Sequence, residues 1–274
     1  MAKENFVLIS GQVLFRPKIY MGRDGVPSKA TMLLKAIRRH YVRSNLNSVN
    51  NGISFDIIPV VTFNPDCIKV CMNTAQHDMV ELRGVYTTKE NQKKSFCEKC
   101  GKEIDNPGVD TFVTPIYIRV TDKVRSAEHP EGYDPEKAID ILKERAEISN
   151  TVKIIGTLCR EPEKIANVKQ SSAQYQIASN RRFRIKEDNP STKTDYPWVK
   201  TYGPQAESDF KALHVGSVIY IDGCFQSRQI KKRTICPSCG CENVVDDVAY
   251  EIVPYSVEYL ANCTLPESNE DENS

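Results

Sequence analysis

Short apolar runs of strand length recur along the first half of this chain, and the run at 79–83 alternates apolar and polar residues, the pattern of a half-buried strand. Turn-forming residues separate the apolar runs, which predict five strands at 6–13, 30–37, 53–63, 79–83 and 111–120. Pro59 inside the third run indicates an edge strand or a bulge, because proline donates no ladder hydrogen bond. Between the third and fourth strands, a proline at position 65 opens a predicted helix at 65–78.

The second half of the chain repeats this order. Apolar runs predict strands at 151–158, 173–183, 196–202, 217–228 and 247–260, with a helix at 203–214 between the third and the fourth. Five strands with a helix in that position are typical of an OB-fold barrel. We therefore expect an all-β protein with short helices, built as two tandem five-stranded OB-fold barrels.

A repeated motif extends the fourth strand of each half. Residues 84–101 read GVYTTKENQKKSFCEKCG and residues 223–240 read GCFQSRQIKKRTICPSCG, at the same offset from the preceding strand. Each copy runs from a glycine through a basic polar stretch to Cys-x-x-Cys-Gly. We expect each copy to form a β-hairpin arm that carries a knuckle of two cysteines.

One knuckle supplies two of the four ligands that a tetrahedral structural zinc site needs. The sequence therefore predicts one Zn²⁺ per chain, shared between the arms and held by Cys97, Cys100, Cys236 and Cys239. A clasp between arms of different chains has the same stoichiometry, and Cys241 is a competing thiol. A redox Cys-x-x-Cys is the alternative, but such a motif opens a helix, and neither copy does.

Two further cysteines and the segments around the barrels complete the organisation. Cys67 and Cys71 share a face of the helix at 65–78, where packed core thiols are favoured over metal ligands. The expected domains are a first barrel at 1–120, an acidic linker at 121–150, a second barrel at 151–262 and a disordered acidic tail at 263–274. The linker ends in a helix at 134–148 that we expect to lie against one barrel, with Asp134 as its N-cap.

Charge and cysteine content limit the function classes. The net charge is only +1, but residues 1–120 carry 17 Lys and Arg against 11 Asp and Glu, and the linker and tail are acidic. A basic body with acidic flanks is compatible with a nucleic-acid partner. Ten cysteines without a secretion signal indicate reduced thiols or metal ligands. No run of 18 apolar residues is present, so we expect a soluble, cytoplasmic protein without a membrane partner.

The third strand of the second half carries the candidate binding chemistry. Alternation places Tyr196, Trp198, Lys200 and Tyr202 on one face, opposite the more compact Pro197, Val199 and Thr201. Aromatic rings interleaved with a lysine form a platform on which unpaired bases stack. A buried aromatic face is the alternative, but it would also bury Lys200. Aromatic residues next to basic ones also occur on neighbouring strands: Phe183 after Arg182, and Phe225 before Arg228.

These motifs resemble those of bacterial single-stranded DNA-binding proteins. The similarity covers nearly all of residues 150–260 and includes NTVKIIGTLCREP at 150–162, IASNRRF at 177–183 and GSVIYIDGCFQSR at 216–228. It implies base stacking by Phe183, Tyr196 and Tyr202 and backbone contacts by Arg181 and Arg228. The first half matches more weakly and adds four candidate contact residues: Arg38, Arg39, Tyr41 and Tyr86.

Three departures from that family bear on partners. Zinc knuckles are not part of its common pattern, and the tail lacks the apolar tip through which replication proteins are recruited. Each chain also has two barrels. If the working unit contains four barrels, as in that family, this protein would be a homodimer. The expected partner is single-stranded DNA, with a second copy of the chain and replication proteins as further possibilities and no small-molecule substrate.

The sequence therefore predicts non-specific binding and protection of single-stranded DNA during replication, recombination or mobile-element transfer. No catalytic constellation is recognisable, so an enzyme is not expected. The alternative is a zinc-stabilised accessory or scaffold subunit of a primase or helicase assembly with little DNA affinity. At the positions that match the platform, the first half has Ile57, Pro59, Val61 and Phe63, so the second barrel is expected to supply most of the stacking.

Overall fold

The computed structural model describes residues 3–38, 55–124, 134–146, 149–165, 171–181 and 194–264 of the 274-residue chain. The first half contains β1 (Asn5–Val13), β2 (Lys18–Met21), β3 (Pro27–Ile37), β4 (Phe55–Thr62), α1 (Pro65–Met72), β5 (Met79–Phe96) and β6 (Glu103–Asp122). The segment between the halves contains α2 (Pro135–Glu144). The described part of the chain therefore begins with five long strands, one short strand and a helix after β4.

The second half repeats the arrangement with β7 (Asn150–Leu158), β8 (Glu163–Ile165), β9 (Ser172–Asn180), β10 (Thr194–Asp195), β11 (Trp198–Tyr202), α3 (Gly203–Ala212), β12 (Val218–Ile235) and β13 (Glu242–Ala261). In each half five strands close into a barrel: β1, β3, β4, β6 and β5 in the first, and β7, β9, β11, β13 and β12 in the second. The fold expected from the sequence is confirmed as two tandem OB-fold barrels.

The two barrels are joined edge to edge by β1 and β7. These strands pair antiparallel, with Asn5 opposite Ile154 and Ile9 opposite Asn150, so the register is symmetric about Val7 and Val152. The junction makes one sheet of both halves, which begins at β10 and ends at β2. Because the junction strands also close their own barrels, neither barrel presents this edge to solvent.

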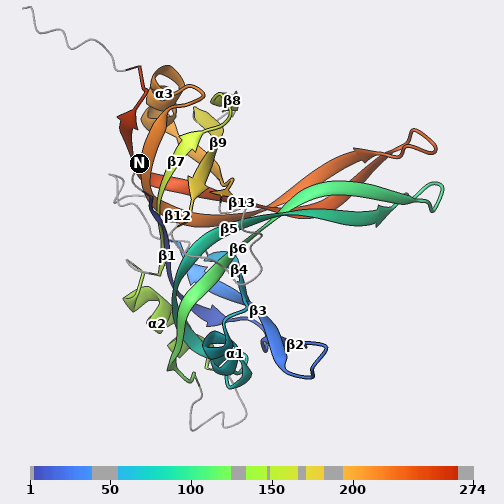
Figure 1. Ribbon diagram of the computed structural model, residues 1–274, viewed down its shortest axis with the longest axis vertical. Helices are drawn as coiled ribbons and strands as arrows, with labels where there is room; N and C mark the ends of the chain where they lie inside the picture. Colours follow the sequence, from blue (N-terminus) through green and yellow to red (C-terminus); the bar gives the residue numbers. More distant parts are fainter. Residues whose placement is uncertain are drawn as a thin grey trace, which may run out of the picture.

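The fourth and fifth strands of each barrel extend into a long hairpin arm. β5 pairs with β6 from Met79 to Phe96, and β12 pairs with β13 from Val218 to Ile235. Each ladder shifts register at a glycine, Gly84 or Gly223, where an added Cβ would lie 2.4 or 2.5 Å from a backbone oxygen of the partner strand. Figure 1 shows the arms leaving the barrels side by side on the same flank.

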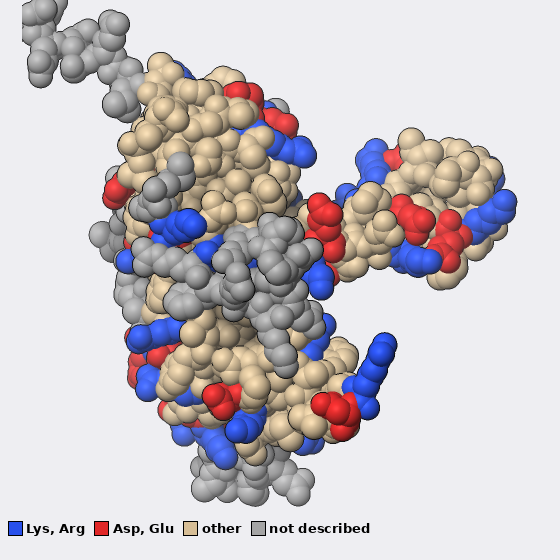
Figure 2. Space-filling model, viewed as in Figure 1, with Lys and Arg blue, Asp and Glu red and all other residues tan. Residues whose placement is uncertain are grey.

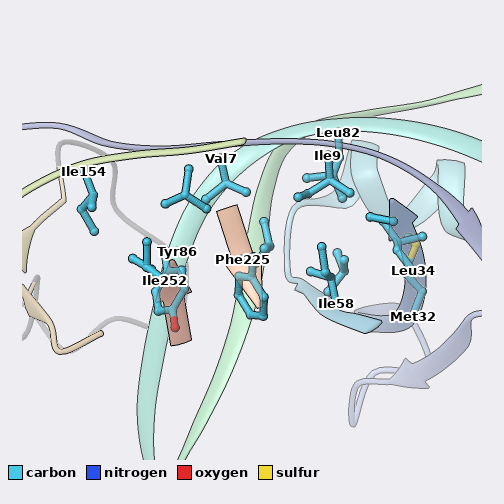
Figure 3. Close-up of a cluster of buried hydrophobic side chains, with 14 of the residues drawn as sticks. Val7, Ile9, Met32, Leu34, Ile58, Leu82, Tyr86, Ile154, Phe225 and Ile252 are labelled. Atoms are coloured by element: carbon cyan, nitrogen blue, oxygen red, sulfur yellow. The ribbon is translucent and has the colours of Figure 1, made fainter. Parts of the chain in front are cut away.

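One hydrophobic core runs through both barrels. Val7, Ile9, Leu34, Ile58 and Leu82 belong to it in the first barrel, and the second barrel adds five of its other members: Ile154, Tyr175, Ile177, Val199 and Ile252. Figure 3 shows Tyr86 and Phe225 between these two sets. The barrels therefore share a single apolar interior.

The helices follow local sequence signals. The side chain of Asn64 caps α1 by accepting from the backbone N–H groups of Asp66 and Cys67. Asp134 caps α2 by accepting from the N–H of Lys137 at 3.1 Å. Ala138 and Leu142 of α2 are buried in a cluster with Met79 of the first barrel, which is where the linker helix packs. None of the helices in the described ranges is long and apolar enough to span a bilayer.

Candidate nucleic-acid interface and thiol cluster

The outer face of β11 carries the candidate stacking residues. Val199 and Thr201 are buried, whereas Trp198, Lys200 and Tyr202 are partly exposed and alternate with them. Tyr196, just before the strand, is exposed, and its N–H donates to Thr88 Oγ1 at 2.8 Å. The alternation expected from the sequence holds, so these four side chains form a face that we call the platform: Tyr196, Trp198, Lys200 and Tyr202.

Two cations lie over rings of the platform. The guanidinium carbon of Arg160 lies 5.4 Å from the centre of the Trp198 ring, and Lys200 Nζ lies 5.6 Å from the centre of the Tyr202 ring. Cations at this distance are attracted to the ring face. Sequence reasoning missed Arg160, because it follows β7 and comes close to β11 only when the barrel closes.

Tyr202 lies where the platform meets the base of the arms. Burial raises the pKa of its hydroxyl, and the nearby Glu251 raises it further, while Arg228 and Arg38 act in the opposite direction. Arg38 belongs to the first barrel, so charges from both barrels converge on this end of β11. The hydroxyl stays protonated at neutral pH and can donate a hydrogen bond.

Two aromatic residues expected at the DNA surface are core residues instead. Tyr86 and Phe225 are fully buried, and their ring centres lie 5.1 Å apart across the interface between the barrels. Phe225 also packs against Tyr250 at 5.6 Å. The expectation that Tyr86 and Phe225 stack on bases was wrong, because joining the barrels encloses the side of each fourth strand that a single barrel would leave open.

Equivalent asparagines hold these two aromatic residues by their backbones. The side-chain amide of Asn5 donates to the carbonyl of Tyr86 and accepts from its N–H, at 2.9 and 2.7 Å. Asn150 makes the same pair of bonds with Phe225, at 2.7 and 2.9 Å. Each junction strand therefore anchors the base of an arm through two buried hydrogen bonds.

Two buried aspartates, one in each barrel, form hydrogen bonds to the arm of the other barrel. Asp195 of the second barrel is fully buried, pairs with Arg181 at 2.6 Å and accepts from the N–H of Thr88 at 2.8 Å. Asp56 of the first barrel is likewise buried, pairs with Arg38 at 2.6 Å and accepts from the N–H of Ser227 at 3.0 Å. The two sets occupy matching places in the repeat.

These ion pairs change the role of two arginines that were expected to contact DNA. The Arg181 side chain is only 4% exposed, so it is enclosed and neutralised by Asp195 rather than presented to phosphates. The Arg38 side chain is 29% exposed, and both of its bonds go to Asp56. The expectation that Arg181 contacts the DNA backbone was wrong. Arg38 forms the same kind of structural ion pair.

The remaining candidates divide into two groups. Arg228 lies beside the buried Glu251, with 3.4 Å between Nε and Oε1, and its side chain remains partly accessible. Four candidates lie outside the described residues: Arg39, Tyr41, Arg182 and Phe183. Of the positions in the first barrel that match the platform, Ile57, Pro59 and Val61 face outward on β4, while Phe63 is buried.

The ends of the two arms bring the four knuckle cysteines together. The sulfur atoms of Cys97, Cys100, Cys236 and Cys239 all lie within 4.8 Å of one another. Across the arms, Cys97 Sγ lies 3.6 Å from Cys239 Sγ, and Cys100 Sγ lies 3.7 Å from Cys236 Sγ. No other group of three or more potential ligands occurs in the part of the chain that is described.

Each knuckle is a tight turn between strands, not a helix start. The N–H of Gly101 donates to the carbonyl of Cys97 at 2.8 Å, and the N–H of Gly240 donates to that of Cys236 at 2.9 Å. Both glycines have positive φ, 68° and 70°, which favours glycine at these positions. The N–H of Cys100 faces Cys97 Sγ and, with other donors, lowers the pKa of that thiol to about 5. A lowered pKa favours the thiolate, which is the form that binds metals.

A fifth thiol borders the cluster. Cys241 Sγ lies 3.1 Å from the sulfur atoms of both Cys97 and Cys239. Cys67 and Cys71, by contrast, are buried in the first barrel, and burial raises the pKa of Cys71 to about 12. The expectation that Cys67 and Cys71 are packed core thiols is confirmed.

Contacts along the arms support the alignment of their ends. Lys93 Nζ of the first arm lies 3.0 Å from Asp247 Oδ1 of the second, and Lys232 Nζ donates to the carbonyl of Pro107 at 3.0 Å. Beside the thiols, the N–H of Glu98 donates to Asn243 Oδ1 at 3.0 Å. The arms therefore touch along their length and at the cluster.

Residues 149–248 match the model of the Single-strand binding protein family. The match lies within the second half of the chain. The matched range includes the whole platform, Arg160 and the second knuckle, and it begins at the strand that joins the barrels. No curated protein matches the chain.

Solved structures with the same fold include a single-stranded DNA-binding protein with which the whole chain can be aligned. The wild-type protein from Thermus aquaticus aligns over 99% of this chain and 100% of its own, at 12% identity and a TM-score of 0.61. A deletion mutant of the same protein, which also carries an arginine-to-alanine substitution, aligns over 97% and 100%, at 13% identity and a TM-score of 0.61. The fold therefore extends over both barrels, while the family match begins at residue 149 and ends inside β13.

Proposed function

We propose that this chain binds single-stranded DNA without sequence preference and protects it during replication, recombination or transfer of mobile DNA. The observation that carries the proposal is the platform on the second barrel, where two aromatic rings each have a cation over them. Stacking on such rings tolerates any base, because every base has a π-face. The role is binding rather than catalysis, with first and second barrels at 1–120 and 151–262.

The platform has the chemistry that the two parts of a nucleotide require. Trp198 and Tyr202 offer partly exposed ring faces, and Arg160 and Lys200 supply positive charge beside them. Neither cation forms an ion pair with a carboxylate within the described ranges, so both charges are available to phosphates. Binding through unpaired cations releases counterions, and the affinity should therefore fall steeply with salt.

We also propose that one Zn²⁺ per chain joins the arm ends through Cys97, Cys100, Cys236 and Cys239. Four thiolates at about 2.3 Å from zinc in a tetrahedron lie about 3.8 Å from one another. The two distances across the arms, 3.6 and 3.7 Å, fit this arrangement. The ion would close the hairpins at their far ends and fix their relative orientation, with Cys241 as a neighbouring thiol outside the set.

Titration of the full chain with fluorescein-labelled oligo-dT at two salt concentrations tests the DNA proposal. We expect tight binding at low salt, a steep loss at high salt and quenching of Trp198, the only tryptophan. Equal affinity for duplex and single strand would contradict it, and no binding to either would favour a scaffold role in a replication assembly. Sedimentation of the free protein tests whether two chains supply four barrels.

A further inference from the structure

The hairpin formed by β2 and β3 is an exposed projection of the first barrel. β2 lies at the end of the continuous sheet and pairs only with β3. Within the hairpin and its approach, Phe15 is 63% exposed, Tyr20 45% and Met21 59%, and Val26 at the turn is also exposed. Single exposed apolar residues are ordinary, but four within twelve residues form a patch that is typical of a contact surface.

The same segment carries free positive charge. Arg16, Lys18 and Arg23 are exposed and Lys29 is partly exposed. None of the four forms an ion pair with a carboxylate in the described parts of the chain, in contrast to Arg38 and Arg181. Figure 2 shows Lys and Arg side chains projecting at the lower right, where Figure 1 places this hairpin.

Asp24 is the only acidic residue between positions 15 and 29, and its carboxylate accepts a hydrogen bond within the turn. Its Oδ1 accepts from the N–H of Val26 at 3.1 Å. The N–H of Gly22 donates to the carbonyl of Val26 at 2.7 Å, and Gly25 adopts a φ of 74°. The hairpin is therefore closed by its own hydrogen bonds and would lose little conformational freedom when it binds a partner.

Tyr20 has the same relation to a cation as the rings of the platform. Lys29 Nζ lies 5.2 Å from the centre of the Tyr20 ring and 5.8 Å from that of Phe63. The corresponding distances on the platform are 5.4 Å for Trp198 and 5.6 Å for Tyr202. A ring with a cation at its face therefore occurs on β2 of the first barrel and on β11 of the second, on strands that do not correspond.

The matching hairpin of the second barrel lacks this chemistry. β8 consists of Glu163, Lys164 and Ile165, without an aromatic residue, and pairs with β9. The outer face of β4 corresponds to the platform, and its residues Ile57, Pro59 and Val61 have no aromatic ring. Phe55 at the start of this face is aromatic, with Lys35 Nζ 4.0 Å from its ring centre, but it packs against the cluster of α2 with Met79.

We propose that the β2–β3 hairpin is a second contact site for single-stranded DNA, in which Tyr20 stacks on a base and Arg16, Lys18 and Lys29 contact phosphates. Phe15 and Met21 supply apolar contact beside the stacked base. This inference rests on the proposed function and adds the first barrel to the path of the strand. A strand held at both places is longer than one barrel can cover, which is about 4–16 nucleotides.

Oligo-dT of two lengths separates the two sites. About ten nucleotides occupy one barrel, and about thirty-five extend over both. The variants are Phe15→Ala with Tyr20→Ala, and as a matched control Tyr117→Ala, a tyrosine on β6 that is 49% exposed. We expect the double variant to bind the long oligonucleotide about ten- to hundredfold more weakly, to keep the Trp198 quenching by the short one, and the control to match the wild type.

Removing charge provides a second measurement that does not depend on the aromatic residues. Arg16→Ala with Lys18→Ala should make the plot of log affinity against log salt less steep by about 1.4 for the long oligonucleotide, because about 0.7 counterions are released per phosphate of a single strand. All four changed residues are exposed, so melting temperatures within a degree of wild type are expected for both double variants.

Each result bears on one proposal. If the wild type neither binds oligo-dT nor quenches Trp198, the proposed function is wrong. If the wild type binds both lengths and the hairpin variants bind the long one with unchanged affinity and salt dependence, the hairpin site is wrong and the platform stands. An equal loss in Tyr117→Ala would also overturn the hairpin site, because the effect would then follow from any exposed tyrosine. Unchanged DNA binding together with a change from dimer to monomer would assign the hairpin to contact between chains.

Discussion

Replacing Asp195 tests whether the buried aspartates hold each barrel to the opposite arm. The carboxylate has no exposure and bonds to Arg181, to the N–H of Thr88 and, at 3.4 Å, to the side-chain amide of Asn5. In Asp195→Ala the guanidinium of Arg181 stays enclosed without its counter-charge. We expect the free energy of unfolding to fall.

The magnitude follows from burial. Removing one partner of a buried ion pair costs about 3–5 kcal/mol, because the other charge remains desolvated. Asp56→Ala is the matched variant in the first barrel, where the Arg38 side chain is 29% exposed rather than 4%. Arg38 can turn to water, so the expected loss there is about 1–3 kcal/mol, the penalty of leaving the backbone N–H of Ser227 unpaired.

Urea unfolding followed by circular dichroism measures both variants. Arg181→Met with Asp195→Ala should recover most of the loss, since replacing a buried pair by apolar side chains is close to neutral. Two outcomes would refute this reasoning. The first is a double variant no more stable than Asp195→Ala. The second is an Arg181→Met variant that loses DNA affinity at unchanged stability, which would return Arg181 to the DNA-contacting residues.

Three further predictions concern the platform, the thiols and a buried carboxylate. Tyr196→Ala with Trp198→Ala should weaken oligo-dT binding at least tenfold, at about 1–3 kcal/mol per stacked base, without lowering the melting temperature. Metal analysis should find one zinc in the wild type and in Cys241→Ser but less than half in Cys100→Ser, and equal zinc in both variants would contradict the ligand set. Burial raises the pKa of Asp209 above its unfolded value, so the folded state binds that proton more tightly and stability should decrease as the pH rises from about 4. Asp209→Asn should flatten this decrease in urea titrations between pH 4 and 7, and an unchanged slope would exclude Asp209 as its source.

Much of the architecture followed from local pattern. Short apolar runs bounded by turn residues located the barrel strands, and the repeated glycine and Cys-x-x-Cys located both arms, because these signals depend on neighbours in sequence. Period-two alternation placed Val199 and Thr201 inside and Trp198 and Lys200 outside. The pairing of the four knuckle cysteines could also be anticipated, since each half offered two ligands for a site that needs four.

The errors arose where the two barrels meet. Nothing in the sequence around Tyr86 or Phe225 distinguishes an aromatic that stacks on a base from one enclosed by a second barrel. Arg181 precedes the acid that neutralises it by 14 positions, and that acid reaches it only through the short pairing of β10 with β9. The β2 hairpin was missed because its four-residue strand lies in a connection rich in proline and glycine.

The junction of β1 with β7 has a consequence for directionality. A strand of DNA reads differently from its 5′ and 3′ ends, and two identical barrels related by a two-fold axis would accept either direction equally. Here the paired strands carry unequal barrels, with aromatic and basic groups on β11 in one and on β2 in the other. If DNA binds at both proposed sites, we expect a strand that crosses the junction to take one preferred polarity on each chain, which a probe attached at one end of the oligonucleotide would reveal.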